Sequence, residues 1–64
     1  MQPHQQRVVD EKSELDAKRE KLHAFIGGAI FSDLEEAEKE RLMQQSEAMK
    51  DYSHILGERI EAFT

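Results

Sequence analysis

Two long stretches of the chain carry apolar residues at helical spacing. The first is marked by apolar residues at heptad positions and at its far end: Val8, Leu15, Leu22, Phe25 and Ile26. This spacing predicts a helix over about residues 5–26 with a narrow apolar stripe. Because the positions that would complete the stripe carry Glu11 and Lys18, the middle of this helix can bury little surface on its own.

The second stretch has a wider apolar face. Its heptad positions are Leu42, Met49, Leu56 and Phe63, and apolar residues flank them at Ala48, Tyr52, Ile55, Ile60 and Ala62. The pattern predicts a helix over about residues 33–63, with Ser32 or Asp33 as its cap. Either Glu35 or Glu36 can complete a capping box there. A face this wide can contact two neighbouring helices.

A short interruption separates the two stretches, and we expect residues 27–32 to form a loop. Gly27 and Gly28 predict the end of the first helix, because glycine readily adopts the left-handed conformation of a C-terminal cap. A connection this short brings two helices together in antiparallel order. The expected fold class is therefore all-α, one domain over residues 1–64 built as a helical hairpin, with a short N-terminal helix as a possible addition.

The size of the chain limits what it can bury alone. A domain of 64 residues buries only about 60% of the surface that its unfolded chain exposes. The sequence contains no cysteine, so neither disulfides nor thiolate metal clusters can stabilise it. Self-association is the remaining means, and we expect a homo-oligomeric helical bundle.

Charge and hydropathy restrict the partners. The net charge is −5, from 14 acidic and 9 basic residues that are interspersed along the chain, which argues against a polymeric nucleic acid as partner. A small anion stays possible, because a pocket needs only a few donors. With no basic region before an apolar run and no apolar stretch of about 18 residues, we expect a cytoplasmic protein without a membrane partner.

Candidate catalytic and metal-binding residues are few. The three histidines, His4, His23 and His54, form neither an HExxH motif nor a paired spacing suited to a metal. The serines lie in helical pattern or at a predicted cap, with no setting that exposes a nucleophile. The sequence therefore predicts no metal, no cofactor and no catalysis.

Arg59 interrupts an apolar pattern and carries two interpretations. On the helical stripe of Tyr52, Leu56 and Phe63 it occupies a position where an apolar residue is usual. Its stem can pack on apolar surface while its head reaches water or a glutamate of a neighbouring chain. Alternatively, several copies can surround a shared cavity and bind an anionic ligand, since the guanidinium fork suits phosphate.

The ordered motifs of the chain point to a family. Residues 3–25, PHQQRVVDEKSELDAKREKLHAF, and residues 49–63, MKDYSHILGERIEAF, resemble the small phage proteins that act as anti-CBASS sponges. The resemblance implies helical chains that assemble into hexamers. It also implies sequestration, without hydrolysis, of the cyclic oligonucleotides that bacterial immune synthases release, in the cytoplasm of the infected host.

The resemblance also implies site residues. Lys21, in KL-x-AF, matches a contact of the cyclic dinucleotide pocket between protomers, and His4 stands near the position of an aromatic residue that relatives use there. His23 and Arg59, the latter in LG-x-RI, match contacts to cyclic trinucleotides on threefold axes. A helical protein–protein interaction module, or a phage regulator without a nucleotide ligand, is the alternative function.

Overall fold

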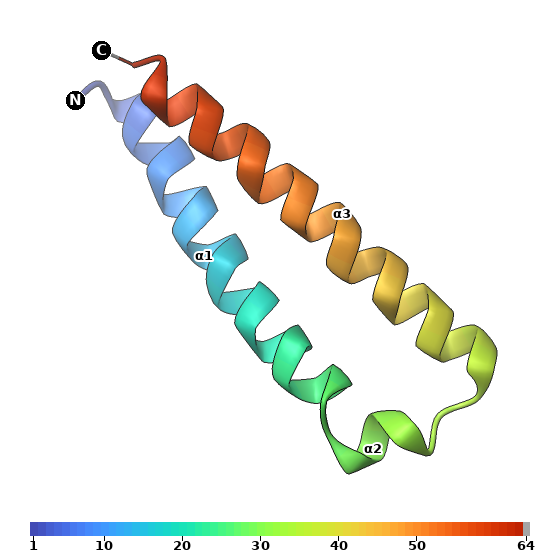
Figure 1. Ribbon diagram of the computed structural model, residues 1–64. Helices are drawn as coiled ribbons and strands as arrows, with labels where there is room; N and C mark the ends of the chain where they lie inside the picture. The colour runs from blue at the N-terminus through green and yellow to red at the C-terminus, as the bar shows by residue number, and fades with distance from the viewer. Residues whose placement is uncertain (64) are drawn as a thin grey trace.

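The chain is a helical hairpin with its two termini at one end. The computed structural model describes residues 1–63, so Thr64, the last residue of the predicted domain, lies outside the described residues. Its helices are α1 (Pro3–Ile26), α2 (Ala29–Ser32) and α3 (Glu36–Glu61). The two long helices run antiparallel side by side, and α2 lies at the end opposite the termini (Figure 1). The all-α fold predicted from the sequence is confirmed, and the hairpin measures 46 × 15 × 13 Å.

Helix α1 begins at Pro3, the single proline of the sequence, and continues without a break to Ile26. Pro3 occupies the first turn, where its missing N–H has no intrahelical acceptor in any case. The Gln2 backbone N–H donates to the Gln5 Oε1 atom over 2.8 Å, which satisfies one donor at the start of the helix. No separate short helix precedes α1 in the described part of the chain.

Helix α1 ends where the two glycines predict its end, but the prediction of a left-handed cap was wrong. Gly27 is right-handed, with φ −80°, and no described residue has a positive φ. The Gly27 N–H donates to the His23 carbonyl over 3.2 Å, and the Gly28 N–H donates to the Phe25 carbonyl over 3.0 Å. A right-handed turn therefore satisfies these carbonyls and leads the chain directly into α2.

The start of α3 differs from the predicted capping box. Ser32 belongs to α2, Asp33 is the C-cap of α2, and Glu35 is the N-cap of α3 without a side-chain hydrogen bond. The Asp33 N–H donates to the Ile30 carbonyl over 3.1 Å, so the turn of α2 uses the residues that were expected to cap α3. Neither Ser32 nor Asp33 caps α3.

The core of the hairpin is small and lies toward the termini. Its buried apolar side chains are Val8, Leu15 and Leu56, and Met49, Ile60 and Phe63 pack against them. From Met49 to Phe63, just beyond the end of α3, the core positions follow alternating steps of four and three residues that pass through Ser53, the spacing of a helix–helix seam. Arg59 is exposed and lies beside this seam. The sequence-based stripe was therefore wrong in aligning Arg59 with Leu56.

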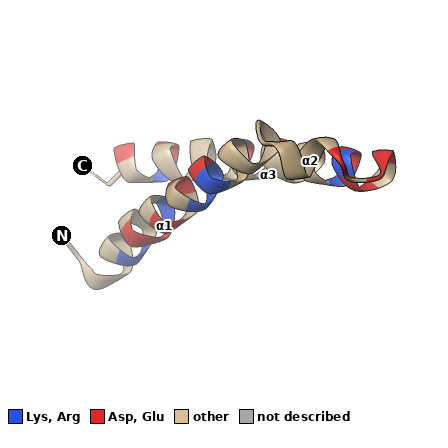
Figure 2. Cartoon of the chain, turned by 90° about the horizontal axis from the view of Figure 1, so that it is seen from below, with Lys and Arg blue, Asp and Glu red and all other residues tan. Residues whose placement is uncertain are grey.

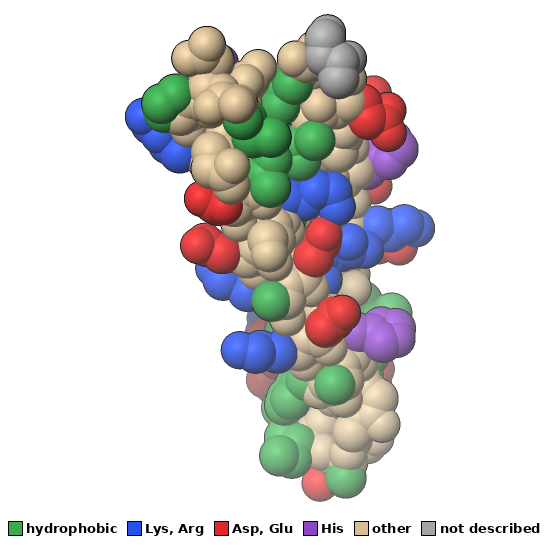
Figure 3. All heavy atoms as spheres, turned by 90° about the vertical axis from the view of Figure 1, so that its left-hand side faces the viewer, with side chains coloured by type: hydrophobic (Ala, Val, Ile, Leu, Met, Phe, Trp, Pro, Cys, Tyr) green, Lys and Arg blue, Asp and Glu red, His purple; other side chains and the backbone are tan. Residues whose placement is uncertain are grey.

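Much apolar surface stays outside the hairpin. Exposed large apolar side chains include Ile30, Met43, Tyr52 and Ile55. Figure 3 shows apolar side chains gathered over both ends of the hairpin and charged side chains across its middle. Acidic and basic residues occur together along both long helices (Figure 2). The middle of the hairpin is accordingly polar even where the two helices face each other.

Candidate ligand-binding site

A polar network crosses the helix interface at its centre. The Asp16 carboxylate accepts hydrogen bonds from Lys12 Nζ over 2.8 Å and from an Arg19 guanidinium nitrogen over 3.0 Å. The Ser53 hydroxyl donates to Asp16 over 2.5 Å and accepts from Lys12 Nζ over 3.1 Å. Ser53 is only 2% exposed, so the network satisfies a hydroxyl that would otherwise be buried without partners.

The network keeps Asp16 ionised. Its hydrogen bond with Lys12, followed by those with Ser53 and Arg19, holds the pKa of the Asp16 carboxyl well below its ordinary value of 3.8. Hydrogen bonds to the charged form of a carboxylate favour that form. Asp16 in turn fixes the direction of the Lys12 and Arg19 side chains, which both lie along the space between α1 and α3.

Gly57 lets the Lys12 side chain pass over α3. A Cβ atom at this position would lie 3.3 Å from the Lys12 Cε atom, closer than an ordinary van der Waals contact. Glycine costs about 1 kcal/mol relative to alanine inside a helix. The close approach of Lys12, which continues to Ser53 and Asp16, gives the structural reason for this residue within α3.

The coupling between Gly57 and Lys12 is testable by a double-mutant cycle. In a Lys12→Ala background, Gly57→Ala is expected to raise the free energy of unfolding by about 1 kcal/mol, the gain in helix propensity. With Lys12 present, the gain is expected to be smaller by at least 0.5 kcal/mol, on the order of a contact coupling. Urea unfolding at one protomer concentration measures both. Equal gains in the two backgrounds would contradict the contact.

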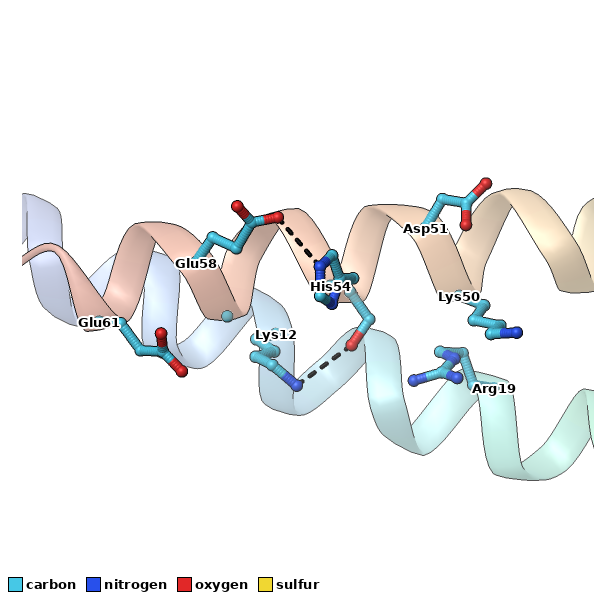
Figure 4. A pocket seen from close by; sticks show the side chains of 9 residues that line it. Lys12, Arg19, Lys50, Asp51, His54, Glu58 and Glu61 are labelled. Carbon is cyan, nitrogen blue, oxygen red and sulfur yellow. Dashed lines mark hydrogen bonds and ion pairs between the residues drawn. The ribbon is translucent and has the colours of Figure 1, made fainter.

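Two open grooves flank the network along one side of the hairpin. The first, of about 410 Å³, is lined by side chains that include Lys12, Arg19, Lys50 and His54. The second, of about 700 Å³, lies toward α2 and is lined by Arg19, His23, Ser46 and Lys50 among others. Arg19 and Lys50 are common to both grooves. Figure 4 shows them between the ribbons of α1 and α3, with His54 bonded to Glu58 further along.

The predicted dinucleotide contacts lie far apart in one chain. His4 is exposed in the first turn of α1, and Lys21 is exposed near its other end. They are 17 residues apart on one continuous helix, a separation of about 25 Å at 1.5 Å per residue. A single protomer therefore does not bring His4 and Lys21 to one small ligand.

The predicted trinucleotide contacts are also separated. His23 lines the second groove, whereas Arg59 is exposed in the last turn of α3 near the termini. The antiparallel register places Arg59 near Asp10, which is 13 residues from His23 on α1, or about 20 Å. Like His4 and Lys21, these two residues can reach one ligand only if they belong to different chains.

One comparison with known proteins decides the family. The Sequestin family model matches residues 2–62, almost the whole chain. The chain belongs to the Sequestin family. Sequestin is the family of phage anti-CBASS cyclic-oligonucleotide sponges, which confirms the resemblance found in the sequence. No curated protein and no solved structure matches the chain.

Membership in the Sequestin family gives the coarse function. It supports a role in sequestering cyclic nucleotides and implies binding more than catalysis. Within residues 1–63, no group of three or more histidine, cysteine or acidic side chains is placed to hold a metal ion. No helix in the same range is both long and apolar enough to pass through a lipid bilayer.

The sequence did not point to the basic residues of the two grooves in this Sequestin chain. Lys12 and Arg19 are seven residues apart, and Lys50 lies on the other helix. The seven-residue interval between Lys12 and Arg19 and the four-residue spacing of Lys12 and Asp16 are sequence features that indicate a polar helix face. Their position opposite Ser53 and Lys50 depends on the register between α1 and α3, which the sequence pattern left open.

Proposed function

We propose that this Sequestin chain captures cyclic dinucleotides, cyclic trinucleotides or both in pockets between protomers and does not degrade them. By binding the signal in the cytoplasm of the infected bacterium, it would prevent activation of CBASS effectors by a phage. The family match over residues 2–62 carries this proposal. The wide separation of the predicted contact residues within one hairpin supports the inter-subunit location.

The pockets need at least two chains. We propose that Lys21 of one protomer and His4 of another contact a cyclic dinucleotide, and that His23 and Arg59 from neighbouring protomers contact a cyclic trinucleotide. The assembly is a homo-oligomer, a hexamer by analogy with the family. Exposed Ile30, Tyr52 and Ile55 provide apolar surface for such contacts, since a hairpin with so small a core gains stability by association.

Calorimetry with a panel of cyclic di- and trinucleotides tests this function. Saturable heat is expected with at least one ligand, and the nucleotide should be recovered intact after the complex is heated. Mass determination in solution, with and without ligand, counts the protomers. If no ligand of the panel binds at tens of micromolar protein, the proposed function is wrong. A protein that is a folded monomer without ligand would favour a protein–protein interaction module that uses the same apolar surface.

Arg59→Ala is expected to weaken capture of a cyclic trinucleotide about ten- to hundredfold and to leave cyclic dinucleotide capture within about twofold. A charge-assisted hydrogen bond contributes about 1.5–3 kcal/mol, and about 1.4 kcal/mol corresponds to a tenfold change in Kd. Arg41→Ala is the matched control, because Arg41 is also an exposed arginine of α3 and pairs with Glu38 over 2.8 Å. An unchanged affinity of Arg59→Ala for the cyclic trinucleotide would contradict the proposed contact by Arg59.

A further inference from the structure

The register of the hairpin places two basic residues opposite each other. Lys12 of α1 passes over Gly57 of α3. Asp16, four residues after Lys12, accepts a hydrogen bond from Ser53, four residues before Gly57. Three residues further in the same register, Arg19 of α1 lies at the level of Lys50 of α3. Both residues line both grooves, which confirms that they lie where the two grooves meet.

Lys50 has no counter-ion in the part of the chain that the structure describes. Although Glu47 and Asp51 are close to it along α3, Lys50 makes no hydrogen bond or ion pair among the described residues. Arg19 uses one guanidinium nitrogen for Asp16, and a guanidinium group has five N–H donors. Both side chains therefore have N–H donors that no described residue uses, at the place where the two grooves meet.

We propose that Arg19 and Lys50 bind one phosphate group of a cyclic oligonucleotide, between α1 and α3 of a single protomer. This inference rests on the proposed function and adds two residues that the sequence resemblance did not assign. Asp16 holds Arg19 in place by the 3.0 Å hydrogen bond, which leaves the outer edge of the guanidinium fork for phosphate. Lys50 supplies the second charge from the opposite helix.

The neighbouring residues indicate which ligand uses this pair. His23 and Ser46 line the same groove on its α2 side, so a ligand held by Arg19 and Lys50 also reaches His23, a predicted trinucleotide contact. Three carboxylates, those of Asp16, Glu20 and Glu47, line the groove as well. The positive charge is therefore limited to Arg19 and Lys50, which suits a single phosphodiester and disfavours a long polyanion. A cyclic trinucleotide is therefore the expected ligand.

Lys50→Gln, with Lys18→Gln as its matched control, tests the proposal. Lys18 is likewise an exposed lysine without a partner among the described residues, and it lines none of the grooves described above. In calorimetry with cyclic triadenylate, Lys50→Gln is expected to raise the Kd at least tenfold, while Lys18→Gln stays within twofold of the wild type.

A second probe separates this inference from the proposed function. Inorganic pyrophosphate is titrated while the NMR signals of the Arg19 side chain are followed. Arg19 shifts that occur in the wild type and disappear in Lys50→Gln support the phosphate site even if no cyclic nucleotide binds, in which case only the function fails. Nucleotide affinity that is equal in Lys50→Gln and wild type overturns the site and leaves the function standing. The absence of both nucleotide binding and pyrophosphate shifts overturns both.

Discussion

Replacing Leu56 by alanine is expected to lower the free energy of unfolding by about 3 kcal/mol, within the range measured for buried leucines. Leu56 is fully buried at 0% exposure, and within residues 1–63 the core has three buried apolar side chains. Its removal leaves a cavity between Val8, Leu15 and the neighbouring residues of α3. Urea unfolding followed by circular dichroism, at one protomer concentration, measures the change.

Met43→Ala provides the control for Leu56. Met43 is also an apolar residue of α3 and is 51% exposed, so its truncation removes apolar atoms without opening a cavity in the hairpin. A cost below about 1 kcal/mol is expected. If Leu56→Ala fails to fold, Leu56→Met, a swap of similar volume, should still fold with a loss below about 1.5 kcal/mol. A loss under 1 kcal/mol in Leu56→Ala would contradict the hairpin core.

Acid is expected to weaken the hairpin through Asp16. Because the network lowers the pKa of folded Asp16 below the ordinary value of 3.8, the unfolded chain binds the proton more readily than the folded chain. The stabilisation by Asp16 is therefore fully present above that value and is lost as the pH falls below it. Thermal unfolding between about pH 5 and pH 2.5 should show the loss.

Asp16→Asn isolates this contribution from that of the other carboxyl groups. Near neutral pH the variant is expected to be less stable by about 1.5 kcal/mol, the low end for hydrogen bonds to a charged group, because Asp16 is partly exposed to solvent and screened. The difference from wild type should shrink as the pH falls. Asp51→Asn serves as the control, because Asp51 is an exposed acid that takes part in none of the hydrogen bonds of the network. An acid-dependent loss that is equal in Asp16→Asn and wild type would exclude Asp16 as its source.

The fold was predictable from periodicity because the apolar spacing is clear in both long helices. Val8, Leu15 and Leu56 were assigned to apolar stripes, and they form the buried core. The sequence pattern misplaced the α3 seam because Tyr52 and Ser53 compete for one position. Apolarity favours Tyr52, yet Ser53 lies inside, since Asp16 and Lys12 on the other helix satisfy its hydroxyl. Such cross-helix pairs are invisible before the register is known.

Part of the candidate site could be predicted from the sequence, and part depends on the register between the helices. Family resemblance pointed to Lys21, His23 and Arg59, and to His4 in place of the aromatic residue of relatives. The roles of these four residues stay predictions. Composition and spacing could not indicate Lys50, because a lone lysine in a charged helix has solvent exposure as its ordinary explanation. It becomes a candidate only when the hairpin register places it opposite Arg19.

The position of both chain ends on the side away from α2 has a practical consequence (Figure 1). A surface anchor or a fluorescent tag joined to either end would extend from the same pole of the molecule. The Arg19–Lys50 region, midway along the hairpin, and the α2 turn would then face the surrounding liquid. Immobilised protein would thus keep this side open to dissolved nucleotide.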